Sequence, residues 1–154
     1  MSVNVVILAA GQGTRMNSDR PKVLHEIAAA PLLVHAMRAG LTLAPERLVV
    51  VAGVGFEEVA EAATTYWPET TVVRQEEQLG TGHAVLCAAD ALTDAAGDTL
   101  VLYNNTPFIT ENTLSRMAET HARADIVVLG FESQPKKHYG QLVTNGNNLL
   151  RIVE

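Results

Sequence analysis

The chain of 154 residues is long enough to form one domain with a hydrophobic core. Its 47% hydrophobic and 18% charged residues exclude a disordered chain, and its net charge of −6 disfavours a broad nucleic-acid-binding surface. The apolar runs stay short of the ~20 residues that span a bilayer, and the N-terminus lacks a signal-peptide pattern. We therefore expect a cytoplasmic protein that binds neither nucleic acid nor membrane.

Short apolar segments rich in β-branched residues alternate along the chain with segments of helical spacing. The expected strands are 3–10, 47–53, 70–75, 98–105 and 125–132. The expected helices are 30–44, 55–66, 80–92 and 110–124. The first strand, VNVVILAA, is apolar on both faces, which is typical of a central parallel strand. The alternation predicts an α/β, Rossmann-like, doubly wound fold, with a mainly parallel sheet and helices on both faces.

The C-terminal part of the sequence has a different pattern. YGQLVTNGNNLLRIVE contains two apolar segments joined by Asn145–Gly146, a pair of residues that favours a tight hairpin turn. We expect a hairpin or the edge of a mixed sheet there. Since the sequence stops at Glu154 directly after an apolar strand, we interpret 1–154 as a single domain truncated on its C-terminal side.

The loop after the first expected strand, LAAGQGTRM, combines two glycines with a basic residue. In open α/β sheets, ligands bind beyond the carboxyl ends of the strands. Gly11 and Gly13 can bring backbone amides close to a ligand, and Arg15 and Lys22 carry the positive charge that phosphates require. The loop is neither a P-loop nor a full dinucleotide fingerprint, so a tight turn with solvated basic residues is the alternative.

A wider set of motifs makes the signal specific. LAAGQGTRM, PKVLHEI, QEEQLGTGHAV, LYNNTPFI and YGQLV with NLLRIVE follow one another in this order and cover almost the whole chain. The set resembles the sugar-nucleotide pyrophosphorylases, which have the nucleotide-diphospho-sugar transferase fold. Within them it is most similar to the N-terminal uridylyltransferase domain of the bifunctional N-acetylglucosamine-1-phosphate uridyltransferase and glucosamine-1-phosphate acetyltransferase.

This resemblance implies a reaction and a set of site residues. The reaction joins UTP and N-acetylglucosamine 1-phosphate into UDP-N-acetylglucosamine and pyrophosphate, with Mg²⁺ as cofactor. The implied catalytic residues are Arg15 and Lys22. The implied nucleotide-binding residues are Leu8, Ala10, Gly11, Gly13, Thr14, Gln75, Gln78, Gly80 and Thr81. Gly140 and Glu154 would bind the sugar, and Asn105 stands where the family has its metal-binding aspartate. We interpret His25 and His83, which also lie in these motifs, as structural.

The Asn104–Asn105 pair departs from the Gly-Asp of the family. Asparagine offers one carbonyl oxygen but no negative charge, so it holds a hard dication less well than aspartate does. We therefore expect reduced catalysis, although Asn105 could still bind metal while the triphosphate supplies most of the charge. A nucleotide-sugar-binding paralogue without transferase activity is the alternative.

Two further implications of the resemblance concern its limits. The family's left-handed β-helix acetyltransferase domain has no counterpart in these residues, so no acetyltransferase activity is assigned. A related transferase that uses another nucleotide shares the LAAGxxxRM opening, but the paired glutamines and Gly-Thr-Gly of QEEQLGTGHA favour the uridylyl enzymes. The sugar and the oligomeric state stay open.

Overall fold

The computed structural model describes residues 2–13, 16–132, 140–146 and 148–153. The chain forms two compact units, Met1–Ser115 and Arg116–Glu154. The first contains the parallel sheet and the second contains a β-hairpin. None of the helices in the described ranges is long and apolar enough to cross a membrane.

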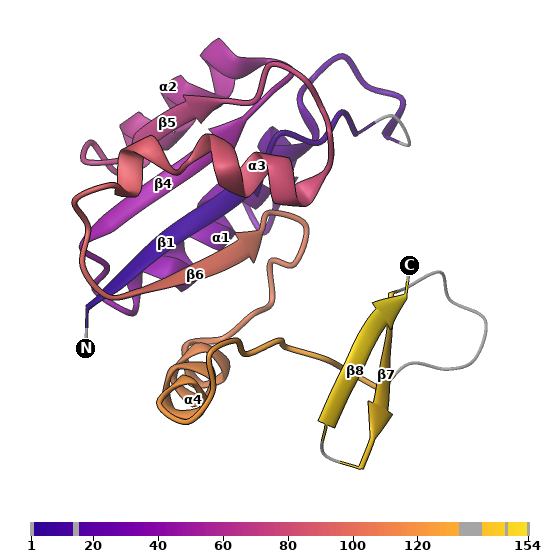
Figure 1. Cartoon of the computed structure of the whole chain (residues 1–154). Coiled ribbons are helices and arrows are strands. Elements are labelled where there is room, and N and C mark those ends of the chain that lie inside the picture. Colours follow the sequence, from indigo (N-terminus) through magenta and orange to yellow (C-terminus); the bar gives the residue numbers. More distant parts are fainter. Residues whose placement is uncertain (1, 14–15, 133–139, 147, 154) are drawn as a thin grey trace. The chain divides into compact units, whose positions relative to one another are not determined.

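A four-stranded parallel sheet forms the centre of the first unit, with the strand order β5-β4-β1-β6 (Figure 1). Its strands are β1 (Val3–Ala9), β4 (Arg47–Ala52), β5 (Thr71–Arg74) and β6 (Asp98–Tyr103). In the centre of β1, Ile7 pairs with Val50 of β4 and Leu102 of β6. Ile7 is fully buried, as are the two residues before it. The apolar pattern of the first segment therefore predicted the central strand correctly.

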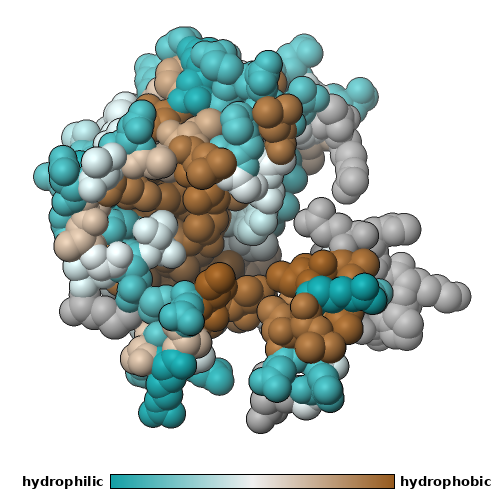
Figure 2. Space-filling model, viewed as in Figure 1, coloured by the Kyte–Doolittle hydropathy of each residue, from teal (hydrophilic) through white to brown (hydrophobic). Residues whose placement is uncertain are grey.

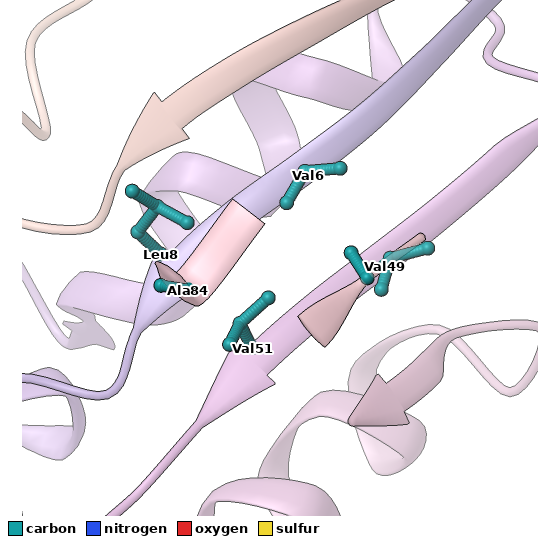
Figure 3. Packing of buried hydrophobic residues seen from close by; sticks show 6 residues of the cluster. Val6, Leu8, Val49, Val51 and Ala84 are labelled. Carbon is teal, nitrogen blue, oxygen red and sulfur yellow. The ribbon is translucent and has the colours of Figure 1, made fainter. Parts of the chain in front are cut away.

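Helices cover both faces of this sheet (Figure 1). They are α1 (Leu32–Leu41) and α2 (Phe56–Tyr66), which contact each other, and α3 (Thr81–Cys87). Gly40 of α1 lies so close to Val5 that a Cβ there would be 2.8 Å from Val5 Cγ1. Because neighbouring strand residues point to opposite faces, Val6 and Leu8 lie on the other face of the sheet. There they form a cluster with residues of β4 and α3 (Figure 3).

These elements confirm the expected doubly wound α/β fold, with local differences. The helix expected over 80–92 ends at Cys87 and is followed by a 3₁₀ turn at Asp90–Leu92. The connection from β1 to α1 contains a 3₁₀ turn at Lys22–Leu24 and a short hairpin of β2 (Glu26–Ile27) and β3 (Ala30–Pro31). Neither the 3₁₀ turn nor the short hairpin was predicted from the sequence.

The small hairpin has an unusual turn, because Ala28 and Ala29 have φ angles of 49° and 61°. Two-residue hairpin turns with positive φ normally use Asn or Gly, so Ala-Ala carries no sequence signal for one. Tertiary contacts hold it instead. The Nε2 of His35 in α1 donates to the carbonyl of Ile27 at 2.8 Å, and the Leu32 amide donates to the His25 carbonyl at 2.9 Å.

Helix α4 (Glu111–His121) begins in the first unit and ends in the second. In the second unit, β7 (Gln141–Asn145) and β8 (Asn148–Val153) form the expected antiparallel hairpin, with a bulge at Val143/Thr144. Gly146 has a φ of 59° in the connecting turn, which glycine adopts without strain. Several apolar side chains of this hairpin are exposed, and Figure 2 shows the apolar surface that they form.

The prediction of a strand over residues 125–132 was wrong. These residues have no regular secondary structure, and Ile126 and Phe131 are 80% and 70% exposed. A strand forms only where a neighbouring strand satisfies its backbone donors and acceptors. Within the described ranges no strand pairs with this segment, so its β-branched composition alone did not produce a strand.

Candidate functional site

A cavity of about 280 Å³ lies in the first unit where β1 and β6 end and where the loop before α3 passes. Its walls come from segments that are far apart in the sequence. The lining residues are Leu8, Ala10, Gly11, Gly13, Lys22, Gln75, Gln78, Gly80, Thr81, Ala84, Tyr103, Asn104 and Asn105. The cavity thus occupies the carboxyl edge of a parallel sheet, which is where this class of fold binds its ligands.

The structure brings together the expected nucleotide-binding residues that it describes, and Lys22 and Asn105 join them. Thr14, Arg15 and Glu154 lie outside the described residues. Gly140 directly precedes β7 in the second unit. The structure thus brings the described residues of the expected site together in one cavity of the first unit.

The glycine loop and Lys22 are in close contact. Gly13 has a φ of 63°, and a Cβ there would lie 2.6 Å from the Lys22 Cβ. The loop is also closed by a hydrogen bond of 2.8 Å from the Met16 amide to the Gly13 carbonyl. Glycine at 13 therefore lets the stem of Lys22 pack against the loop, and both residues line the cavity.

The two expected glutamines have different partners. Gln78 Nε2 donates to the carbonyl of Ala10 at 2.8 Å and so ties the loop before α3 to the end of β1. The Gln75 residue is 5% exposed, and its Nε2 is 3.1 Å from the Gly80 carbonyl oxygen and 3.0 Å from His83 Nδ1. Its backbone amide donates to Ala52 at 2.8 Å, which continues the β4–β5 ladder. Hydrogen bonds thus fix both the backbone and the side chain of Gln75.

Gly80 connects this loop to α3. Its φ of 99° and ψ of −177° belong to a region that is essentially restricted to glycine. Its carbonyl accepts the amide of Ala84 at 3.1 Å, the first hydrogen bond of the helix, in addition to the Gln75 side chain. The glycine required here places Thr81 and Ala84 on the cavity wall.

The cavity-lining residues that follow β6, Asn104 and Asn105, have no acidic side chain. Asn104 is 8% exposed and its amide lies 3.4 Å from the Leu8 carbonyl, whereas Asn105 is exposed. The described lining contains no carboxylate, and the described residues form no cluster of three or more His, Cys, Asp or Glu that could hold a metal ion. The side chains of these residues therefore supply only neutral oxygens to a metal, which is a poor fit for a hard dication held by the protein.

Tyr103, Asn104 and Ala84 also line the cavity, although none of them was among the expected site residues. Tyr103 pairs with Leu8 across β6 and β1, so both side chains lie on one face of the sheet. The strand alternation contained that signal, because Leu8 was expected at the site.

Replacing Gly13 by alanine is expected to lower the free energy of unfolding by about 2 kcal/mol. Alanine would have to adopt a left-handed backbone conformation there, and its Cβ would overlap with the Lys22 side chain. Chemical denaturation measures this. Gly11→Ala is the matched control, since nothing lies within 4 Å of a Cβ at Gly11 and its φ is not positive. Equal losses in the two variants would contradict the close contact.

Comparison with known families is decisive for the class of protein. Residues 5–150 match the family model of the MobA-like NTP transferase domain. The chain belongs to this family. Among curated relatives of this NTP transferase domain, the bifunctional protein GlmU of Ruegeria sp. strain TM1040 is 60% identical over 154 residues, which are 100% of this chain and 34% of that protein. GlmU of Cereibacter sphaeroides is 59% identical over 153 residues, with 34% of its length covered.

The chain thus spans about a third of the length of the curated relatives that it matches. These matches confirm the resemblance to the N-terminal part of the bifunctional enzymes. Among solved structures, HddC from Yersinia pseudotuberculosis shares the fold of this NTP transferase domain with a TM-score of 0.78 at 23% identity, covering 100% of this chain and 69% of that chain. Family and fold together support an NTP transferase domain.

Proposed function

We propose that the cavity binds UTP and a sugar 1-phosphate, and that the chain is the transferase domain that forms UDP-N-acetylglucosamine and pyrophosphate from UTP and N-acetylglucosamine 1-phosphate. One observation carries the proposal: a glycine loop, a lysine and two glutamines that are distant in sequence line one cavity at the carboxyl edge of the sheet. The high identity to GlmU supports the choice of substrates.

The proposed reaction is a direct displacement. A phosphate oxygen of the sugar 1-phosphate attacks the α-phosphorus of UTP, the new P–O bond forms, and the bond to the β-phosphate breaks as pyrophosphate leaves. Such transfers depend on positioning and charge neutralisation more than on a covalent protein group. Lys22 supplies a cation at the cavity wall, and Gly11 and Gly13 let backbone groups approach the phosphates. Arg15 is proposed as a second cation.

A divalent ion, Mg²⁺ in this proposal, would add positive charge at the phosphates. Asn105 is the residue proposed to contact it, through one carbonyl oxygen. Because the described lining has no carboxylate, the ion would depend on the triphosphate for its anionic ligands. No step of the proposed mechanism is therefore assigned to the metal.

A second candidate function follows from the same asparagines. A domain that keeps the nucleotide cavity but lacks a charged metal ligand would bind a nucleotide sugar with weak or no turnover. Asn104 and Asn105 favour this alternative, whereas Lys22 and the glutamines are consistent with either function.

The base-binding part of the proposal is tested by Gln75→Ala. Loss of a buried hydrogen-bonding partner costs about 1–3 kcal/mol, so the Kd for UTP should rise roughly 5- to 150-fold. Isothermal titration calorimetry measures the change. Gln12→Ala is the matched control, because Gln12 is exposed and lies outside the cavity lining, and its Kd should match that of the unaltered chain. An unchanged affinity in Gln75→Ala would refute the assignment of Gln75 to the uracil.

A further inference from the structure

The orientation of the Gln75 carboxamide follows from its partners. The Gly80 carbonyl oxygen can only accept a hydrogen bond, so the Gln75 atom at 3.1 Å from it must be the NH₂ nitrogen. The same nitrogen lies 3.0 Å from His83 Nδ1. Because an amide NH₂ group can only donate, Nδ1 must be the acceptor in this hydrogen bond. His83 is therefore in the neutral form that carries its proton on Nε2.

Both N–H bonds of the carboxamide are thus directed at protein partners. The hydrogen bonds that the described residues make with this side chain all involve Nε2, which leaves Oε1 as its polar atom for a ligand. Gln75 is 5% exposed and lines the cavity. The buried side chain therefore presents a fixed acceptor to whatever base binds there, and its donor group is withheld.

A fixed acceptor discriminates between pyrimidines. The N3 atom of uracil carries a hydrogen and donates, whereas the N3 atom of cytosine is an acceptor. Placed against Gln75 Oε1, uracil forms a hydrogen bond, and cytosine brings two acceptors together. A carboxamide free to rotate by half a turn would offer its NH₂ group to cytosine, so selectivity requires that the rotation be prevented.

We propose that His83 is a positioning residue that sets the base specificity of the site, because its Nδ1, together with the Gly80 carbonyl, holds the Gln75 carboxamide with the oxygen available to the base. This inference rests on the proposed function, since it requires a uridine nucleotide in the cavity. His83 itself lies in the first turn of α3 and is half-buried. Its position there follows from Gly80, which starts the helix three residues earlier.

A purely structural role for the same contacts makes a different prediction. Gln75, Gly80 and His83 also brace the loop that leads into α3, and loss of that brace would weaken folding or the binding of all nucleotides alike. A positioning role instead changes the ratio of the affinities for UTP and CTP. The ratio is therefore the informative readout.

The experiment compares the Kd values for UTP and CTP in the unaltered chain, His83→Leu and His83→Asn, by titration calorimetry. The asparagine side chain can place a carbonyl oxygen close to the position of Nδ1, whereas leucine fills similar space without an acceptor. We expect the preference for UTP, measured as the ratio of the Kd for CTP to the Kd for UTP, to fall about tenfold in His83→Leu, in line with one buried hydrogen bond to a base. His83→Asn should keep the preference within about twofold. Thermal unfolding of each variant verifies that it is folded.

The outcomes separate this inference from the proposed function. If the unaltered chain shows no preference for UTP over CTP, the proposed function and this inference both fail. If it prefers UTP and a folded His83→Leu keeps that preference, only the role of His83 is refuted.

A second measurement needs no substitution. Long-range ¹H–¹⁵N spectra of the imidazole in the unaltered chain at neutral pH should show His83 Nδ1 without a proton and Nε2 with one. A proton on Nδ1 would remove the acceptor and overturn the proposal, even if His83→Leu does not fold.

Discussion

Replacing Asn105 by aspartate is expected to raise Mg²⁺-dependent pyrophosphate release from UTP and N-acetylglucosamine 1-phosphate at least tenfold. Asn105 lines the cavity, whose described residues include no carboxylate. An aspartate there adds a charged oxygen ligand, which Mg²⁺ prefers to a neutral amide. A tenfold gain needs only about 1.4 kcal/mol of additional stabilisation. A coupled phosphate assay measures the rate over a range of Mg²⁺ concentrations, and the half-saturating concentration should fall.

The control for this prediction is Asn112→Asp. It makes the same change of charge at an exposed position of α4 in the first unit, outside the cavity lining. Its rate should equal that of the unaltered chain. A gain in Asn105→Asp alone would identify a transferase weakened at its metal ligand. If neither the unaltered chain nor either variant releases pyrophosphate, and UDP-N-acetylglucosamine still binds, the result would instead support the nucleotide-sugar-binding alternative.

Sequence predicted the central part of the fold because its signals there are local and dense. Residues 5–9 are apolar on both faces, and only a strand covered on both sides by helices satisfies that pattern. Residues 125–132 have similar composition but no paired neighbour in the described ranges, so the same signal predicted a strand that is not formed. The Ala28–Ala29 turn shows the opposite case, in which tertiary contacts impose a conformation without any sequence signal.

The candidate site was predictable to the level of which residues meet, through motifs that recur in order along the chain. The local conformations of these residues were harder to predict from the sequence. That Gly13 has to be glycine depends on Lys22, nine residues later, and follows only from the packing of the two. The orientation of the Gln75 carboxamide likewise depends on partners at Gly80 and His83. His83 was interpreted from its motif as a structural residue, and only the geometry supports the role proposed for it at the base.

Lys22→Ala is expected to raise the Kd for UTP roughly 10- to 150-fold, because hydrogen bonds to charged groups contribute about 1.5–3 kcal/mol. The reason is the position of Lys22 on the cavity wall, where contact with Gly13 holds its stem against the loop. Uridine has no phosphate, so its Kd should change little in the same variant. Calorimetric titration with both ligands thus separates a loss of phosphate binding from a general disturbance of the site.

Arg20→Ala is the matched control, because it removes a nearby positive charge that is outside the cavity lining and that pairs with Glu26 at 3.5 Å on the surface. An exposed pair of this kind contributes little, so the UTP affinity of Arg20→Ala should stay within about twofold of the unaltered chain. Equal weakening by Arg20→Ala and Lys22→Ala would mean that overall charge, rather than a cation placed by the glycine loop, attracts the nucleotide. Weakening of uridine and UTP to the same extent would place Lys22 away from the phosphates, and the proposed displacement would lose the one cation that the described structure supplies to it.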